Sequence, residues 1–474
     1  MAAPSVEDVL IHVLPNFGID SIKTEQKVIL ECLVSKKNCV AVLPTGFGKS
    51  LPFQLYLPVV REICENSSDW KVLVCCPLVA LMQDQVEKLS HIANLSAAYK
   101  GSSSQIDDNI KDGLIDIIYA SPETLVGDPE WRNCLKKLNI KVIVIDEFHT
   151  IAIWGQGEGG RKEAFRKWFG NIGELRSLFP EATVLALSAT CTVNIRQKVM
   201  KILQLTDDTK EINMSPNKSN IKLVSSKIKN EIEMGMTWLV DALDEKKGDF
   251  PRTIIYCSSI NDTSKLYKYI TTELPSCTKY VEMFHSETPD SNKNMIIHAL
   301  KDEGSAIRII LSTSALGMGF DVKMCNSVIL FGPPNNLVDM LQEIGRVGRD
   351  GNPSVAIILY NGYHQQKLSP EVKAILRTKE CRRKELMSNF LRNSDLHEME
   401  SKECGKHSCC DLCASRCSCN SCTLLPLEKL FLAEHVVEEG HDDSFSDSDT
   451  ESYNLSEYDY FEDLDLGLLE IQDD

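Results

Sequence analysis

Ten apolar runs along the chain have the length and composition of buried β-strands. In the first half they cover 40–43, 71–76, 116–120, 141–145 and 183–187. In the second half they cover 253–257, 281–284, 307–311, 328–331 and 355–359. The runs are rich in Val, Ile and Leu and do not alternate with polar residues, which is typical of parallel strands covered on both faces. Because helical patterns separate them, they predict an α/β fold with two lobes joined near 205–245.

The last part of the chain has a different pattern. Residues 371–391 predict a helix, and eight cysteines crowd between Cys381 and Cys422. From Glu438 to Asp474 there are fifteen acidic residues and no Lys or Arg, a composition that predicts disorder. The expected parts are a first lobe over 1–210, a second lobe over 211–365, a cysteine-rich module over 366–424 and an acidic disordered tail over 425–474.

The net charge of −17 is unusual for a protein that binds nucleic acid. The acidic segment accounts for most of it and leaves −2 for residues 1–437, so local basic patches remain compatible with the composition. No apolar run reaches the ~18 residues of a membrane span, and the N-terminus does not resemble a secretory signal. We therefore expect a protein of the nucleus or cytosol whose 18 cysteines are reduced.

A loop with the spacing of a phosphate-binding P-loop follows the first predicted strand. Lys49 and Ser50 end the loop and open an amphipathic stretch. In such loops backbone amides surround the phosphates, the lysine meets the β- and γ-phosphates, and the serine hydroxyl holds Mg²⁺. Leu43 stands where the usual pattern begins with Gly, and alone the segment fits a plain turn equally well. The expected nucleotide ligands are Thr45, Gly46, Phe47, Gly48, Lys49 and Ser50.

An acidic pair ends the strand at 141–145. An unpaired carboxylate at Asp146 would be costly beside a buried strand, so a bound Mg²⁺ explains it better than a core ion pair. Glu147 is the natural group to orient the attacking water, since phosphoryl transfer depends on positioning and charge neutralisation. His149 completes this acidic box, and Ser188-Ala189-Thr190 follows the next strand.

Two arginines in the second half suggest a role in the same chemistry. Arg346 and Arg349 lie three residues apart and would share one face of a helix. A solvated basic face is the alternative. Gln342 and the small residues Gly345 and Gly348 favour arginine fingers that close on the γ-phosphate from the second lobe.

The four segments 41–50, 142–149, 187–190 and 342–349 stand in the order of a two-lobed helicase motor of superfamily 2. Over residues 14–413 the chain resembles the RecQ family of ATP-dependent DNA helicases, in a short form without the winged-helix or C-terminal helical accessory domain. The resemblance implies tandem RecA-like lobes with parallel sheets, a small helical zinc-binding module, and ATP, Mg²⁺ and Zn²⁺ as cofactors. It also implies 3′→5′ movement on single-stranded DNA, unwinding of forked or junction DNA, and a nuclear role in recombination or repair.

The resemblance assigns roles to further residues. Lys23, where the family usually has Arg, and Gln26 correspond to the adenine-reading segment. Gly319 and Asp321 belong to the segment that links DNA to the nucleotide in the second lobe. The residues expected to contact DNA are Pro77, Gln83, Gln85, Ser121, Trp154, Phe165, Arg166 and His285.

The chain departs from the family pattern at two places. Phe148 stands in the acidic box where the family has Ala or Cys, which predicts crowding. The family's aromatic-rich loop is interrupted between Trp154 and Phe165 by an insertion that contains three glycines and lacks the usual His-Asp pair. Because this loop couples DNA contact to hydrolysis in the family, we expect ATP hydrolysis to be stronger than strand separation.

The cysteine-rich module resembles the RecQ zinc module. Cys381, Cys410 and Cys413 fit its pattern, and we expect Cys404 as the fourth ligand, with His407 or Cys409 as substitutes. Four thiolates, or three and an imidazole, suit tetrahedral zinc, whereas reduced cysteines in a loop are the alternative. The remaining thiols, which either bind a second metal or stay free, are Cys417, Cys419 and Cys422.

Two other functions fit parts of the sequence. One is an RNA helicase of the same superfamily, and the other is a non-catalytic nucleic-acid-binding protein descended from a helicase. The acidic tail either contacts protein partners, folds back on the DNA groove as a phosphate mimic, or remains a solvated segment.

Overall fold

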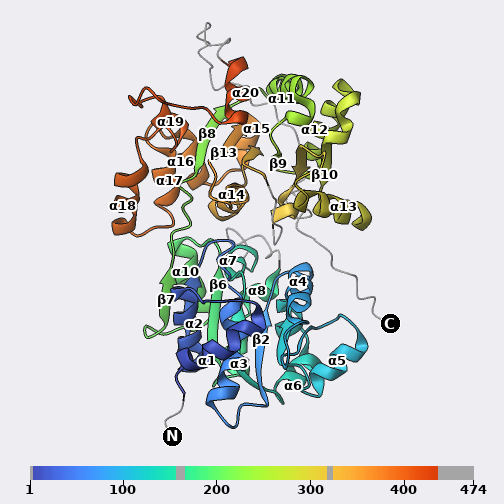
Figure 1. Cartoon of the computed structure of the whole chain (residues 1–474), viewed down its shortest axis with the longest axis vertical. Helices are drawn as coiled ribbons and strands as arrows, with labels where there is room; N and C mark the ends of the chain where they lie inside the picture. The colour runs from blue at the N-terminus through green and yellow to red at the C-terminus, as the bar shows by residue number, and fades with distance from the viewer. Residues whose placement is uncertain (1–3, 156–165, 318–323, 436–474) are drawn as a thin grey trace. The chain divides into compact units, whose positions relative to one another are not determined.

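The computed structural model describes residues 4–155, 166–317 and 324–435, and Figure 1 shows the chain with its elements labelled. The chain forms two compact units, residues 1–216 and 217–474. Each unit contains one sheet whose strand pairs all run parallel, and helices pack on it. This arrangement confirms the predicted α/β fold with two lobes. Among the described residues, no helix is both long and apolar enough to cross a membrane.

The first unit contains a seven-stranded sheet in the order β3-β4-β2-β5-β6-β1-β7. Its strands are β1 Cys39–Val42, β2 Trp70–Cys75, β3 Ala97–Tyr99, β4 Ile117–Ala120, β5 Asn139–Ile145, β6 Thr183–Ser188 and β7 Lys210–Asn213. Successive residues of a strand face opposite sides of the sheet, so Ala41 joins one hydrophobic cluster while Val40 and Val42 join the other. Both faces are therefore buried, as the unbroken apolar runs predicted.

Helices cover both faces of this sheet. The first cluster includes residues of the helices α1 Val6–Val13, α2 Thr24–Val34, α3 Leu51–Ile63 and α4 Val79–Leu89. The second includes residues of α5 Ser104–Lys111, α6 Pro129–Leu135, α7 His149–Trp154, α9 Glu174–Leu178 and α10 Val193–Ile202. The short helix α8 Lys167–Gly170 contacts α7.

The second unit contains a six-stranded sheet in the order β10-β11-β9-β12-β13-β8. Its strands are β8 Ile221–Lys227, β9 Thr253–Cys257, β10 Val281–Phe284, β11 Ile309–Ser312, β12 Ser327–Phe331 and β13 Ser354–Tyr360. Its first helices are α11 Ile232–Lys246, α12 Ile260–Glu273, α13 Asp290–Lys301, α14 Leu337–Ile344 and α15 Gly362–Lys367. The edge strand β8 was not predicted, and it positions the cysteine-rich module.

The cysteine-rich module packs beside β8 (Figure 1). Its helices are α16 Pro370–Arg377, α17 Arg382–Met387, α18 Asn393–Glu403 and α19 Asp411–Ala414. Leu223 of β8 forms a parallel bridge with Cys410, and its N–H donates to the Cys409 carbonyl at 3.2 Å. The guanidinium of the buried Arg383 donates to the carbonyls of Ile221 and Cys409. The module is thus joined to the sheet of the second unit through main-chain groups.

The single helix predicted over 371–391 is wrong, because the chain leaves the helix at 378–381. Arg382 occupies the break, where its Nη1 donates to the carbonyls of Ile375 and Leu376 at 2.9 and 3.1 Å. These carbonyls belong to the last turn of α16 and lack partners within the helix. The Arg382 Nε also donates to the Asp411 carboxylate at 2.8 Å, which connects α17 to α19. The break brings Cys381 to the start of α17.

The disordered tail predicted from 425 is also wrong at its beginning. Helix α20, Pro426–His435, packs against the second unit, and its Leu427 and Phe431 belong to that unit's hydrophobic cluster. The Phe431 ring meets Trp238 of α11 edge to face, with 5.1 Å between ring centroids. Buried apolar side chains outweigh the acidic composition here. Residues 436–474 lie outside the described part of the chain.

Candidate functional site

The P-loop connects β1 to α3, and its conformation explains its glycines. Gly46 and Gly48 have φ angles of 81° and 87°, a left-handed conformation that glycine adopts without strain. A Cβ on Gly48 would lie 2.6 Å from Gln26 Nε2. Leu43, where the usual pattern has Gly, is fully buried in the first unit's core and donates its N–H to Ser188 at 3.0 Å. The departure at Leu43 is therefore accommodated by packing.

Lys23 and Gln26 hold the loop in place. Gln26 Nε2 donates to the carbonyls of Phe47 and Gly48, both at 3.0 Å. Lys23 Nζ donates to the Phe47 carbonyl at 3.1 Å and lies 4.2 Å from the centre of the Phe47 ring. The structure thus assigns both residues a positioning role at the P-loop, and their expected contact with adenine stays a prediction.

The acidic box lies at the carboxyl end of β5. Lys49 Nζ is 3.9 Å from Glu147 Oε1, so the P-loop lysine and the candidate water-orienting carboxylate face the same space. Glu147 has a φ angle of 51°, a left-handed conformation that few residues with a side chain adopt. Its N–H donates to Asp146 Oδ1 at 3.0 Å.

The Asp146 carboxyl fits a Mg²⁺ ligand. Burial, followed by the neighbouring negative charge of Glu147, raises the pKa of Asp146 to about 7, while Lys49 opposes the shift. A divalent cation would offset both unfavourable effects on the carboxylate. Ser50, the residue that precedes α3, supplies the hydroxyl that the P-loop pattern places on the same ion.

His149 connects the acidic box to Ser188-Ala189-Thr190. His149 Nδ1 lies 2.8 Å from Ser188 Oγ and 3.4 Å from Glu147 Oε2. The Ser188 hydroxyl donates to the Thr190 carbonyl at 2.8 Å, so Nδ1 must carry the hydrogen that joins the histidine to the serine. The ring is 2 % exposed, so His149 orients its neighbours from within the protein.

Phe148 causes no crowding in the acidic box. Its side chain is fully buried in the hydrophobic cluster that includes Ile143 and Ile151, and its N–H donates to Leu187 at 3.0 Å. The predicted crowding is therefore wrong, because the ring points into the core rather than toward the carboxylates.

The segments expected to contact DNA in the first unit are tied to one another. Arg166 Nε donates to Glu123 Oε1 at 2.7 Å, and its Nη1 donates to the Pro77 carbonyl at 2.9 Å. Arg166 thereby connects the segments around Pro77 and Ser121, both of which are expected to contact DNA. Gln85 Oε1 accepts a hydrogen bond from Gln54 at 2.8 Å, and the exposed Gln83 donates to the Tyr99 hydroxyl at 3.1 Å.

The remaining residues expected to contact DNA have different surroundings in the structure. Ser121 Oγ lies 3.3 Å from Thr124 Oγ1 within one turn. His285 is 7 % exposed, and burial lowers the pKa of its imidazole. Trp154 ends α7, whereas Phe165 lies outside the described residues. Their contact with DNA stays a prediction.

The second unit holds its arginine segment in a loop, not in a helix. Helix α14 ends at Ile344, so the predicted helical face shared by Arg346 and Arg349 is wrong. Gly348, with a φ angle of 63°, turns the chain between the two arginines. Gln342 is in the last turn of α14. Gly319 and Asp321 of the neighbouring segment lie outside the described residues.

Two residues that the sequence did not single out position this loop. Lys218 Nζ donates to the carbonyls of Gly345 and Val347 at 2.7 and 3.3 Å. Asn220 Nδ2 donates to the Gly348 carbonyl at 2.9 Å. Both residues lie just before β8, more than a hundred residues earlier in the chain than Arg346 and Arg349. No local sequence pattern connects them to these arginines.

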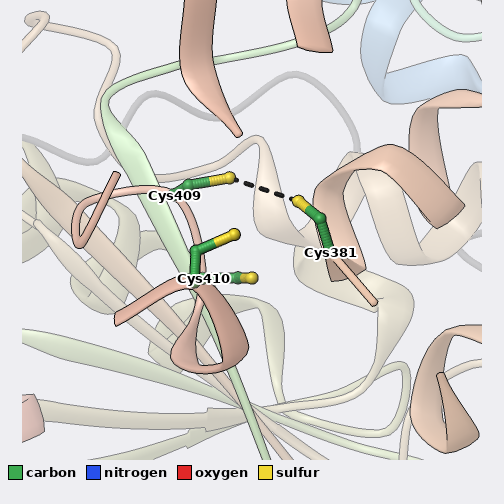
Figure 2. Close-up of side chains that lie close together, drawn as sticks. Cys381, Cys409 and Cys410 are labelled. Atoms are coloured by element: carbon green, nitrogen blue, oxygen red, sulfur yellow. Dashed lines mark hydrogen bonds between the residues drawn. The ribbon is translucent and has the colours of Figure 1, made fainter. Parts of the chain in front are cut away.

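Four buried thiols form a candidate zinc centre at the cysteine-rich module. The sulfur atoms of Cys381, Cys409, Cys410 and Cys413 all lie within 4.8 Å of one another. Cys381 and Cys409 point toward each other with 3.5 Å between sulfurs, and Cys410 projects beside them (Figure 2). This donor set fits tetrahedral zinc.

The structure also separates the candidates for the fourth ligand of this centre. Cys409 belongs to the group of four. Cys404 Sγ is 3.3 Å from Cys381 Sγ, but it does not lie within reach of all the other thiols. His407 belongs to a different cluster. The arrangement therefore favours Cys409 over Cys404, which the sequence had put first.

Comparison with known proteins identifies the class of the chain. The DEAD/DEAH box helicase family matches residues 23–198, and the helicase conserved C-terminal domain matches residues 234–351. The crystal structure of the DUF1998 helicase MrfA bound to DNA and AMPPNP is similar, with a TM-score of 0.60 at 19% identity. The match covers 80% of this chain and 53% of the MrfA chain. The two units are thus the paired RecA-like lobes of a superfamily 2 helicase.

Curated relatives narrow the class. The chain is 30% identical over 427 residues to the mouse bifunctional 3′-5′ exonuclease/ATP-dependent helicase WRN, covering 84% of this chain and 29% of that protein. It is 32% identical over 349 residues to the probable ATP-dependent DNA helicase RecS of Bacillus subtilis, covering 72% and 65%. The chain belongs to the RecQ family. It spans less than two thirds of the length of either relative.

Proposed function

We propose that the protein is an ATP-dependent DNA helicase that moves 3′→5′ on single-stranded DNA. The observation that carries the proposal is the convergence of Lys49 and Glu147 beside Asp146. Membership of the RecQ family supports DNA as the nucleic acid. The same resemblance supports forked or junction DNA as the substrate. It also supports a role in recombination or repair, in the nucleus and also in the cytoplasm.

Residues of the first lobe have different roles in ATP hydrolysis. Lys49 binds the β- and γ-phosphates, and Glu147 orients the attacking water. Ser50 and Asp146 would hold Mg²⁺, which would supply positive charge against the phosphates. Lys23 and Gln26 keep the P-loop carbonyls turned away from the nucleotide, which leaves the loop amides free for phosphate.

The second lobe contributes charge. Arg346 and Arg349 stabilise the negative charge that develops on the transferred phosphoryl group, as arginine fingers do. Lys218 and Asn220 fix the loop that carries them. The four thiols of Cys381, Cys409, Cys410 and Cys413 would hold zinc, which would stabilise the fold of the cysteine-rich module at the edge of this lobe.

Coupling between hydrolysis and unwinding is the property in which this chain should differ from its family. The insertion between Trp154 and Phe165 contains three glycines, which make it a poor lever between DNA and the nucleotide site. We infer strong DNA-stimulated ATP hydrolysis with weak unwinding of long duplexes in the absence of a partner.

Unwinding of tailed duplexes tests the proposed direction and coupling. A 16-base-pair duplex, about 1.5 helical turns, would carry a single-stranded tail at either the 3′ or the 5′ end. We expect the strands to separate only when the tail is at the 3′ end. We also expect the protein to hydrolyse many ATP molecules for each base pair that it opens. Equal separation with the 5′ tail contradicts the direction, and equal activity on an RNA duplex favours the RNA-helicase alternative.

A further inference from the structure

A second group of potential metal ligands lies beyond the four-thiol centre. One ligand atom from each of His407, Cys417, Cys419 and Cys422 lies within 4.8 Å of all the others. Cys419 Sγ is 3.3 Å from His407 Nδ1 and 3.3 Å from Cys422 Sγ. Cys417 Sγ is 3.9 Å from the same imidazole nitrogen. This group shares no residue with the first centre.

The spacings agree with tetrahedral coordination. With Zn–S bonds of about 2.3 Å and Zn–N bonds of about 2.0 Å, neighbouring ligand atoms of a tetrahedron lie about 3.5–3.8 Å apart. The three measured separations fall on either side of this range. Three thiols and an imidazole suit zinc and exclude magnesium and calcium, which require oxygen ligands.

The backbone is arranged so that the thiols converge. Asn420, between Cys419 and Cys422, has a φ angle of 55°, which Asn tolerates better than most residues. The resulting turn brings two exposed sulfur atoms together, although residues 417–425 form no helix or strand. A cavity of about 410 Å³ borders His407, Cys417 and Cys419 and provides a route for a metal ion.

The position of the group in the chain indicates that a metal bound there would be structural. Residues 414–425 connect the last thiol of the first centre to α20, which packs on the second lobe. Few apolar side chains of this connection are buried. A short segment without a hydrophobic core needs a cross-link to hold one conformation.

We propose that His407, Cys417, Cys419 and Cys422 bind a second zinc ion, which fixes the connection between the cysteine-rich module and α20. The ion is structural, since all four of its positions are occupied by protein ligands. The site is independent of ATP hydrolysis, so it can be tested without an activity measurement.

Zinc content of the full-length chain tests the proposal. The double variant Cys419→Ser/Cys422→Ser should contain one zinc ion per chain fewer than the wild type, measured by inductively coupled plasma mass spectrometry. The matched control Cys64→Ser/Cys134→Ser changes two partly buried thiols outside both clusters and should keep the wild-type content. Equal zinc content in all three proteins would overturn the proposal.

Thiol reactivity in the wild-type chain gives a second test that needs no variant to fold. Maleimide labelling followed by peptide mass spectrometry should find Cys417, Cys419 and Cys422 protected when zinc is present. A chelator should expose them to labelling. Labelling as rapid with zinc as without it, or a disulfide between Cys419 and Cys422 in the protein as purified, would contradict a metal site.

Discussion

At the scale of single residues, the nucleotide site is a connected series of polar side chains. Lys49 faces Glu147, Glu147 lies beside His149, and His149 is joined to Ser188. A change at the Glu147 carboxylate can therefore reach the Ser-Ala-Thr segment through one buried imidazole. The His149 residue is only 2 % exposed and contacts its neighbours within the protein.

The first prediction concerns the two groups that we propose act directly on ATP. Lys49→Ala and Glu147→Gln should each slow ATP hydrolysis by at least about 100-fold, because each removes a group whose effect is largest in the transition state. Steady-state ATP turnover checks this, with far-UV circular dichroism to confirm folding. The control Lys88→Ala removes an exposed lysine of α4 and should turn over ATP normally. Wild-type turnover in either folded site variant would refute the assignment.

A second prediction distinguishes the candidates for the fourth ligand of the first zinc centre. Cys409→Ser should lower zinc content by one ion per chain and reduce solubility, because a structural zinc contributes directly to folding. Cys404→Ser should retain the metal, since its thiol lies outside the group of four. Metal analysis of both variants decides between them, and the reverse pattern would restore Cys404 as the ligand.

At the scale of elements, α20 is held by a buried ion pair. Lys222 Nζ of β8 is 2.5 Å from Glu428 Oε1, and the two side chains are 5% and 3% exposed. Glu428 Oε2 also accepts a hydrogen bond from the Leu425 N–H at 3.2 Å. The pair joins the edge strand to a helix two hundred residues later in the chain.

The third prediction follows from this pair. Glu428→Gln should lower the free energy of unfolding by about 3 kcal/mol, because it leaves the Lys222 charge buried without its carboxylate. The double variant Lys222→Met/Glu428→Leu should recover most of the loss, since apolar side chains replace both charges. Urea denaturation measures both. A loss below about 0.5 kcal/mol for the single variant, typical of a surface site, would show that α20 is not held in this way.

The same pair shows where prediction from sequence fails. All ten apolar runs that predicted strands overlap observed strands by all but one or two of their residues, because unbroken Val/Ile/Leu runs have few alternatives to a buried strand. The largest offset is at 307–311, where the observed strand β11 starts two residues later. Strand β8 was missed because Lys222 breaks its apolar pattern, and only the distant Glu428 makes that lysine compatible with burial.

The candidate site likewise has parts that could be predicted from the sequence and parts that could not. The P-loop and acidic box could be placed from sequence, since each is a short run of residues at a fixed spacing after a strand. Lys218 and Asn220 could not, because their contacts with the arginine loop depend on the chain returning to it from far away. Cys409 was secondary to Cys404 because spacing along the chain does not reveal which sulfur atoms converge.

At the scale of the whole molecule, charge is distributed unevenly along the chain. The segment from Glu438 to Asp474 carries fifteen acidic residues, and the rest is nearly neutral. A segment of this charge can compete with DNA phosphates for the same basic groups, and it can equally remain solvated or contact other proteins.

The fourth prediction follows if the segment competes with DNA. Truncation after Val437 should tighten binding of single-stranded DNA, most strongly at low salt, where charges are least screened. Fluorescence anisotropy at about 50 and 200 mM salt measures the difference. Equal affinity of the full and truncated chains at low salt would show that the segment does not compete.

We propose above that this RecQ-family chain is a DNA-driven ATPase motor. ATP hydrolysis by the full-length protein should be measured without nucleic acid, with single-stranded DNA and with single-stranded RNA of the same sequence, using Glu147→Gln as the inactive control. Hydrolysis should be slow without nucleic acid, strongly stimulated by DNA and more weakly stimulated by RNA. Hydrolysis that DNA leaves unchanged, or that Glu147→Gln retains, would contradict it.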